Sequence, residues 1–153
     1  MTIFRVSSCR YIHDMSGTGG LYAAGRWHYK GTRILYFSEH ISLAKLEVLA
    51  SSTFLPKKMC LLSIELHSDV SIKTLNPNDI PHDWQLYPHP DILKKITHEW
   101  IGKTESFLLK VPSAQSTSEY NYLLNPLHPE MDKVKTKRVE SISFDRRLKL
   151  SYD

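Results

Sequence analysis

Glycine is distributed very unevenly along this chain of 153 residues. Five of its six glycines fall within residues 17–31, whereas the eight prolines begin only at Pro56. Glycine adopts backbone conformations that other residues avoid and allows another group to approach the backbone closely. The segment 17–31 is therefore predicted to turn tightly or to approach a ligand.

The composition is typical of one folded domain spanning residues 1–153. Hydrophobic residues make up 41% of the chain and charged residues 24%, which argues against wholesale disorder. No apolar run approaches the roughly 18 residues of a membrane helix, and no secretory signal is visible at the N-terminus. We therefore expect a cytoplasmic protein without membrane contact. The net charge of +4 favours anionic ligands such as nucleotides but is too small to require nucleic acid.

The cysteines and histidines show no metal-binding pattern. Cys9 and Cys60 do not predict a disulfide framework, and Cys60 stands in an apolar run where it is expected to be a buried small hydrophobe. The eight histidines have no spacing typical of metal ligands. We expect no metal site.

The residue pattern predicts about six short strands and two or three helices. They follow one another without regular strand–helix–strand units, which indicates an α+β fold. One helix is expected at Ser42–Ala50 with Ser42 as N-cap, and another at Pro90–Lys103 with Gly102 as its stop. The expected strands are Ile3–Val6, Arg33–Phe37, Met59–Leu66, Ser106–Val111, Tyr120–Leu124 and Val139–Phe144.

Glu47 is the unusual residue of the first of these helices. At about 100° per residue it shares one apolar stripe with Leu43, Leu46 and Ala50, while Lys45 points the opposite way. An unpaired carboxylate on a buried face is costly. The residue is therefore either part of a structural ion pair at the edge of the stripe or a carboxylate in a partly closed cleft, where it would act strongly on a substrate.

Arg26 and Tyr36 flank the end of the glycine-rich segment. Backbone N–H groups of a glycine loop, ended by Arg26, could hold a phosphate. Tyr36 shares a strand face with Ile34 and Ser38, where it either packs in the core or stacks on a nicotinamide or adenine ring.

Later segments carry weaker signals. Ser113 directly follows a strand, but no nucleophile elbow surrounds it, so a turn or cap is its ordinary role. Asn121 and the run Asn125–Pro129 belong to a turn-rich segment. The basic run Lys133–Arg138 indicates a solvated tail or strand edge, with an acidic partner or nucleic acid as the alternative.

In combination, these motifs resemble the RES domain, which is named for an arginine, a glutamate and a serine. The positions that match those three are Arg26, Glu47 and Ser113. The resemblance covers about residues 4–129 and is most specific between Gly25 and Glu47. The segments that carry it are Gly17–Gly20, Gly25–Trp27 with Gly31, Leu35–Ser38, Ser42–Leu49, Val111–Ser113 and Asn121–Pro129.

The resemblance implies a fold similar to ADP-ribosyltransferases, with short mixed strands in small sheets and a few flanking helices. It implies NAD⁺ as substrate, with Arg26 on its phosphates or ribose and Tyr36 near the nicotinamide. Glu47 would bond the ribose and stabilise positive charge at the anomeric carbon, and Ser113 and Asn125 would line the pocket. His28 departs from the asparagine that the family often has, which removes an amide that could contact substrate.

The family also implies a function. RES proteins are toxins of bacterial toxin–antitoxin pairs, whose partner is an Xre-type helix-turn-helix antitoxin that would mask the active site. The expected reaction is cleavage of the nicotinamide–ribose bond by phosphorolysis or hydrolysis, which depletes NAD⁺ and arrests growth. ADP-ribosylation of a cellular protein is the alternative, and an RNA-binding or RNA-cleaving toxin is a weaker one. We expect no cofactor or metal and no direct binding of nucleic acid, and leave open a homodimer or a higher toxin–antitoxin assembly.

Overall fold

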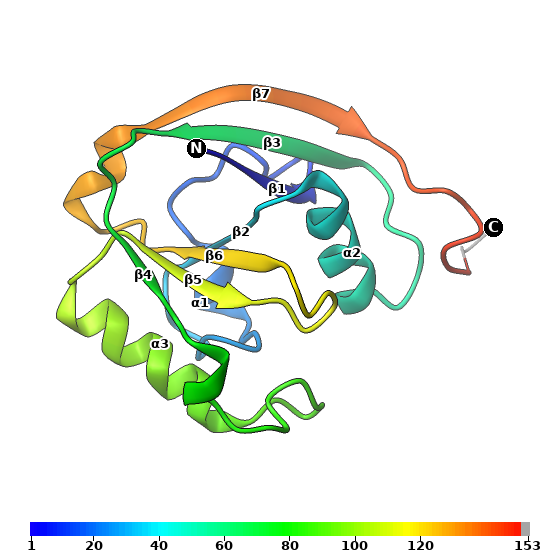
Figure 1. Ribbon diagram of the computed structural model, residues 1–153. Coiled ribbons are helices and arrows are strands. Elements are labelled where there is room, and N and C mark those ends of the chain that lie inside the picture. The colour runs from blue at the N-terminus through cyan, green and yellow to red at the C-terminus, as the bar shows by residue number, and fades with distance from the viewer. Residues whose placement is uncertain (151–153) are drawn as a thin grey trace.

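The computed structural model describes residues 1–150 and contains one seven-stranded sheet with the strand order β4-β5-β6-β2-β1-β3-β7 (Figure 1). Within residues 1–150, the β4–β5 pairing is parallel and the other strand pairings are antiparallel. Its strands are β1 (Thr2–Ser8), β2 (Leu35–Ser38), β3 (Met59–Leu66), β4 (Ile72–Thr74), β5 (Leu108–Pro112), β6 (Tyr120–Leu124) and β7 (Val134–Ile142).

The helices are few and flank the sheet. They are α1 (Gly19–Tyr22), α2 (Ile41–Ser51) and α3 (Asp91–Lys103), with the 3₁₀ turns η1 (Pro77–Asp79) and η2 (Pro129–Lys133). The α+β class is confirmed. The expected small sheets are instead joined into one, because β1 pairs with β2 on one side and with β3 on the other. No helix within the described residues combines the length and hydropathy needed to cross a membrane.

The two halves of the sheet are covered by different elements. Helix α3 lies beside β4 and β5, whereas α2 lies near β1 and β2 (Figure 1). Trp100 and Leu93 of α3 pack on Leu109 and Val111 of β5. A second group of buried side chains from β1, β2, β3, β5 and β6 forms the largest apolar cluster. Burial of this area is the main favourable term in folding.

Strand β3 has the predicted boundaries but is more buried than its alternation suggested. Leu62 and Ile64 belong to the large cluster as expected. The alternation of this segment predicts a half-buried strand with Cys60, Leu62, Ile64 and Leu66 on one face, but Leu61 and Ser63 on the opposite face are buried as well. Leu61 on that face is 2% exposed, because Ala44 of α2 and Phe144 of the C-terminal segment cover it.

The limits and buried face of the helices differ from the prediction. His40, not Ser42, is the N-cap of α2. Leu46 is 41% exposed and Ala50 is also exposed, so the predicted apolar stripe was wrong. The buried residues of α2 are Leu43 and Ala44. Glu47 lies on the same side of the helix, and this side faces the sheet and the cavity.

The second long helix ends at Lys103, as predicted, but its two capping residues differ from the prediction. Pro90 is the N-cap of α3 rather than its first residue. Gly102 lies inside the helix, and Thr104 ends it in the left-handed conformation with φ of 53°.

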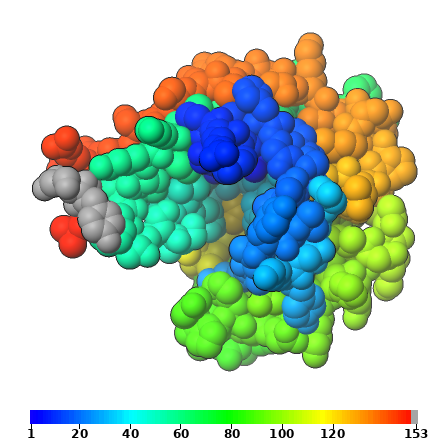
Figure 2. All heavy atoms as spheres, turned by 180° about the vertical axis from the view of Figure 1, so that it is seen from behind, coloured from blue at the N-terminus to red at the C-terminus, as the bar shows by residue number. Residues whose placement is uncertain are grey.

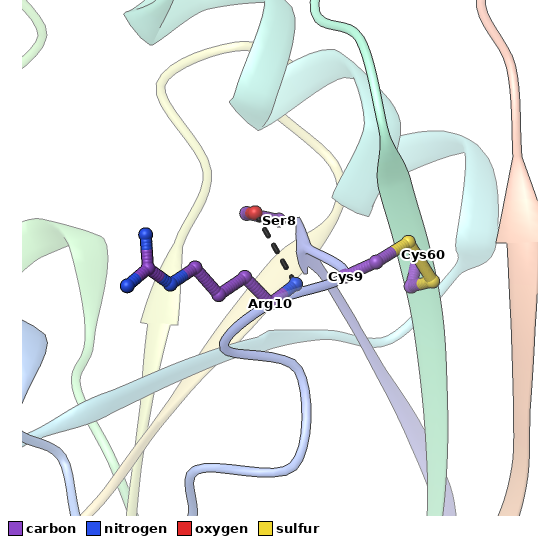
Figure 3. The surroundings of a disulfide bond; sticks show 4 residues. All are labelled: Ser8, Cys9, Arg10 and Cys60. Carbon is purple, nitrogen blue, oxygen red and sulfur yellow. Dashed lines mark hydrogen bonds between the residues drawn. A yellow bond between two sulfur atoms is a disulfide. The ribbon is translucent and has the colours of Figure 1, made fainter.

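Cys9 and Cys60 form a disulfide (Figure 3), which corrects the expectation that the cysteines are unlinked. The register of β1 and β3 places Ser7 opposite Cys60, so that Cys9, which directly follows β1, lies close to Cys60. Their separation of 51 residues gave no sign of this pairing. Cys60 is buried, as predicted.

The basic run falls on the sheet edge. Strand β7 begins at Val134, five residues before the predicted Val139, and among the described residues it is the edge strand beside β3. Residues 135–138 are exposed, so the interpretation of this run as a strand edge is confirmed.

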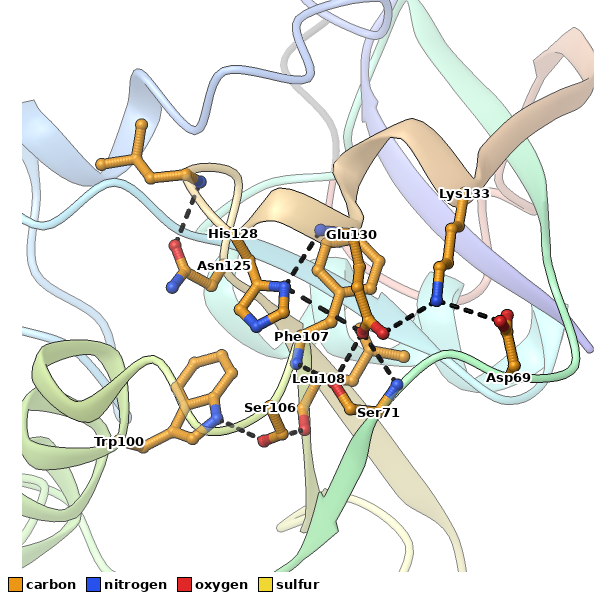
Figure 4. Close-up of polar contacts among 11 residues, drawn as sticks. Asp69, Ser71, Trp100, Ser106, Phe107, Leu108, Asn125, His128, Glu130 and Lys133 are labelled. Carbon is orange, nitrogen blue, oxygen red and sulfur yellow. Dashed lines mark hydrogen bonds and ion pairs between the residues drawn. The ribbon is translucent and has the colours of Figure 1, made fainter.

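A polar cluster joins η2 to the strands beneath it (Figure 4). Glu130 Oε2 accepts hydrogen bonds from the backbone N and the hydroxyl of Ser71, and Lys133 donates to Glu130 Oε1 at 3.0 Å. The bonds from Ser71, followed by Lys133, lower the pKa of Glu130 to about 2. Phe107 N donates to the Ser71 hydroxyl, which fixes the start of β5.

Candidate active site

A cavity of about 130 Å³ opens between β1, β2, α2 and the glycine-rich segment. Seen from behind, the surface is hollowed between the blue N-terminal segments and the cyan-to-green segment that includes α2 (Figure 2). Its polar lining consists of Arg5, Arg26, Tyr36, Ser38, Glu47 and Asn121. Three residues predicted from the sequence, Arg26, Tyr36 and Glu47, thus meet in one cavity.

Glu47 is held by two neutral donors on one of its oxygens. Oε1 accepts from the Ser113 hydroxyl at 2.7 Å and from Asn121 Nδ2 at 2.6 Å. Hydrogen bonds to an ionised carboxylate are about twice as strong as neutral ones. The carboxylate is therefore fixed in orientation at the cavity wall.

Asn121 is itself oriented by Ser38. The two residues are directly opposite in the β2–β6 register, and the Ser38 hydroxyl donates to Asn121 Oδ1 at 2.6 Å. Ser38 is 4% exposed and Asn121 is 8% exposed. The sequence pattern placed Asn121 in a turn-rich segment; only the strand pairing shows that it reaches Glu47.

Ser113 combines its ordinary turn role with a contact to Glu47. Its hydroxyl oxygen accepts from the backbone N of Gln115 at 3.0 Å and of Ser116 at 3.2 Å. The same hydroxyl donates its proton to Glu47. Ser113 is fully buried, so its hydrogen bond holds the Glu47 carboxylate from the interior of the protein.

Tyr36 is fixed by His28. Nε2 of His28 lies 2.9 Å from the carbonyl oxygen of Ala23, which can only accept, so this nitrogen carries the proton. Burial lowers the pKa of His28, which favours the neutral ring. The Tyr36 hydroxyl then donates to Nδ1 at 2.7 Å. Burial, the largest effect, raises the pKa of Tyr36, so the phenol stays protonated.

Gly25 allows this pair to form. A Cβ at Gly25 would lie 2.9 Å from the His28 ring and 3.0 Å from the Tyr36 hydroxyl. The glycine-rich segment is thus approached closely at Gly25, as predicted, and the groups that approach it are the side chains of His28 and Tyr36. His28 replaces the asparagine of the family pattern, and its ring fills this space.

Arg26 lies at the cavity wall and is tied to the segment before α3. Its Nη1 donates to the carbonyl oxygens of Trp84 at 2.8 Å and Leu86 at 3.3 Å. The guanidinium carbon lies 5.9 Å from the centre of the Trp84 ring. Burial lowers the pKa of Arg26, and the charge of Glu47 opposes this shift.

Arg5 is a second cation at the cavity that the sequence did not single out. It donates from Nη1 to the carbonyl oxygen of Asp14 at 2.8 Å, and burial lowers its pKa. An arginine inside the short apolar strand Ile3–Val6 was the available signal.

Asn125 does not join the cavity. It follows the end of β6, whereas Asn121 lies near the beginning of the strand. Its Oδ1 accepts from the backbone N of Leu127 at 3.1 Å, and its side chain is 3% exposed (Figure 4). The expectation that Asn125 lines the pocket does not agree with this position, because the asparagine that reaches the cavity is Asn121.

Comparison with known proteins gives similar sequences and a similar fold. The chain is 34% identical to "Toxin Res" of Yersinia enterocolitica over 155 residues, covering 97% of this chain and 100% of that protein. It is 31% identical to "Prs ADP-ribosylating toxin" of Sphingobium sp. over 139 residues, covering 88% and 86%.

A solved structure described as the M. tuberculosis MbcT-MbcA toxin-antitoxin complex contains a chain of the same fold. The TM-score is 0.72 at 12% identity, and the match covers 93% of this chain and 84% of that chain. The family model described as "RES domain" matches residues 2–150. This chain therefore belongs to the RES domain family.

Proposed function

We propose that this protein is the toxin of a toxin–antitoxin pair and that it consumes NAD⁺ by breaking the nicotinamide–ribose bond. The observation that carries the proposal is the Glu47 carboxylate, held on one oxygen by Ser113 and Asn121 at the wall of a cavity that also contains Arg26 and Tyr36. The sequence similarity to two proteins named as toxins supports the biological role.

The chemistry needs little beyond such a carboxylate. When the bond between the anomeric carbon and the nicotinamide nitrogen breaks, its electron pair stays on nitrogen, and nicotinamide leaves neutral. Positive charge develops on the ribose, and a fixed carboxylate stabilises it electrostatically. No general acid is required, because the leaving nitrogen is already cationic in NAD⁺. The proposal therefore uses no metal or further cofactor.

The remaining residues have distinct proposed roles. Arg26 bonds the phosphates or the adjacent ribose of NAD⁺, and Arg5 adds positive charge to the same cavity. Tyr36 packs near the nicotinamide, with its ring fixed by His28. Ser113 acts through Glu47 rather than by contact with solvent or substrate.

The acceptor of the ADP-ribosyl group distinguishes three versions of the reaction. Attack by phosphate gives an ADP-ribose phosphate, and attack by water gives ADP-ribose. Attack by a protein side chain gives an ADP-ribosylated protein. The name of the Sphingobium relative, "Prs ADP-ribosylating toxin", supports the third version, in which a protein is the acceptor.

The proposed partner of this chain in the cytoplasm is an Xre-type antitoxin, which would mask the cavity. A homodimer of the toxin and a larger toxin–antitoxin complex are the alternative assemblies.

The test is NAD⁺ loss with purified protein, in phosphate buffer and in phosphate-free buffer. We expect turnover by the wild type and strong loss in Glu47→Gln and Arg26→Ala, whereas Arg146→Ala, which removes an exposed arginine, retains activity. An ADP-ribose phosphate product indicates phosphorolysis, and label from NAD⁺ on lysate proteins indicates protein modification. Growth arrest without NAD⁺ loss or protein labelling would contradict the proposal and favour an RNA target.

A further inference from the structure

Ser38 and Asn121 line the cavity, and the hydrogen bond between them also sets which end of the Asn121 amide faces Glu47. An asparagine side chain has an acceptor end and a donor end, and rotation by half a turn exchanges them. In Asn121 the acceptor Oδ1 faces the Ser38 hydroxyl and the donor Nδ2 faces Glu47. The opposite orientation would bring an amide oxygen against the carboxylate.

We infer that Ser38 is a positioning residue, which acts through Asn121 to fix the orientation of the Glu47 carboxylate. Two consecutive hydrogen bonds, each of 2.6 Å, connect Ser38 to Asn121 and Asn121 to Glu47. The inference rests on the proposed function for its kinetic consequence, but the hydrogen-bond arrangement is independent of it.

The fold makes this chain of bonds rigid. Ser38 and Asn121 are opposite residues of neighbouring strands, so their side chains project on the same face of the sheet. Both are buried, and a buried polar group left without a partner is costly. The geometry therefore penalises every orientation of the amide except the one that donates to Glu47.

The arrangement leaves the two oxygens of Glu47 unequal. Both Asn121 and Ser113 donate to Oε1, and they approach from β6 and from the turn after β5. Oε2 is then the oxygen presented to the ribose of the proposed substrate. Loss of the amide would let the carboxylate rotate. The stabilisation of the transition state would then fall more than the binding of the substrate.

The kinetic test separates positioning from general stability. Asn121→Ala is expected to lower kcat about 10- to 100-fold, the usual effect of removing a group that orients a reacting residue, with KM within about threefold. Ser38→Ala is expected to lower kcat less, and Ser38→Thr, which keeps the hydroxyl, to restore most of it. Ser63→Ala is the matched control, because Ser63 is also a buried strand serine but lies on β3.

A double variant gives the decisive kinetic comparison. If Ser38 acts through Asn121, then Ser38→Ala adds nothing to Asn121→Ala, and the double variant matches the single one within about twofold. Losses that multiply, or losses in KM alone, would overturn the inference. Circular dichroism and melting of each variant identify any that fail to fold, in which case Ser38→Ala and Ser38→Thr carry the comparison.

A measurement without turnover distinguishes this inference from the proposed function. The side-chain amide protons of Asn121, assigned by their absence in Asn121→Ala, are followed by NMR hydrogen exchange. They are expected to exchange much more slowly than those of exposed Asn78 and to lose that protection in Ser38→Ala. Equal exchange of Asn121 and Asn78 in the wild type would overturn the inference. Slow exchange without NAD⁺ turnover would instead reject only the proposed function.

Discussion

The hydroxyl of Ser113 donates a hydrogen bond of 2.7 Å to Oε1 of Glu47, across a sequence separation of 66 residues. This bond joins the turn after β5 to α2. The same hydroxyl oxygen accepts from two backbone N–H groups, so one side chain both closes the turn and holds the carboxylate.

Ser113→Ala should therefore impair stability and activity together. The backbone N–H groups of Gln115 and Ser116 lose their acceptor, and Glu47 loses one donor. Each of these part-buried hydrogen bonds contributes about 0.5–1.5 kcal/mol to the free energy of unfolding. We expect a lower melting temperature and a kcat reduced by at least about tenfold. Ser118→Ala, at an exposed position of the same loop, is the control, and equal behaviour of both variants would contradict the role of Ser113.

Tyr36→Phe should destabilise the protein although the ring remains. The change removes the only donor shown for His28 Nδ1, within the described part of the chain, and leaves a buried nitrogen without its partner. We expect the free energy of unfolding to fall by about 1–3 kcal/mol, measured by denaturant titration. Tyr22→Phe, at an exposed tyrosine, should change it by less than about 0.5 kcal/mol. A Tyr36→Phe variant as stable as the wild type would show that this hydrogen bond does not hold the ring.

Glu130 gives a prediction about pH. Its pKa in the folded protein is about 2, below its ordinary value of 4.5, because Ser71 and Lys133 hydrogen-bond to its carboxylate. A carboxyl group with a lowered pKa stabilises the fold above its unfolded-state pKa, and this contribution is lost as pH falls toward the folded-state pKa. Between about pH 4.5 and 2, the free energy of unfolding should fall less in Glu130→Gln than in the wild type.

Glu99→Gln is the control for this pH effect, since Glu99 is exposed on α3. Its free energy of unfolding should follow the wild-type pH dependence. Identical pH profiles for Glu130→Gln and the wild type would show that the Ser71–Glu130–Lys133 cluster does not contribute as proposed.

The Cys9–Cys60 disulfide should stabilise the fold under oxidising conditions. Closing a loop of 51 residues limits the unfolded chain and contributes up to about 4 kcal/mol. The double change Cys9→Ala with Cys60→Ala is expected to lower the free energy of unfolding toward the value of reduced wild type. Equal stability of oxidised wild type, reduced wild type and the double variant would contradict a stabilising link.

The sequence identified Glu47 for a reason that was only partly right. The helical period correctly marked a carboxylate beside buried positions of α2, but Leu46 and Ala50 are exposed and Ala44 is buried. The period defines which residues share a side of a helix. It does not define which side faces the sheet when apolar residues surround the helix on all sides.

The missing part of the site depends on strand pairing. Asn121 and Asn125 stand in one short segment with similar composition, yet only Asn121 lies opposite Ser38 and reaches Glu47. Ser38 and Asn121 are 83 residues apart in the sequence, and Cys9 and Cys60 are 51 residues apart. Contacts of this kind follow from the sheet register, which local patterns do not specify.

The most direct test of the account is the rate of NAD⁺ loss with Glu47→Gln beside Glu99→Gln. Glutamine has nearly the shape of glutamate and keeps an acceptor for Ser113 and Asn121, but it lacks the charge that would stabilise the ribosyl cation. We predict that Glu47→Gln folds normally and loses at least about 100-fold in kcat, whereas Glu99→Gln retains wild-type turnover. Wild-type turnover in both variants would contradict the assignment of Glu47 as the reacting carboxylate.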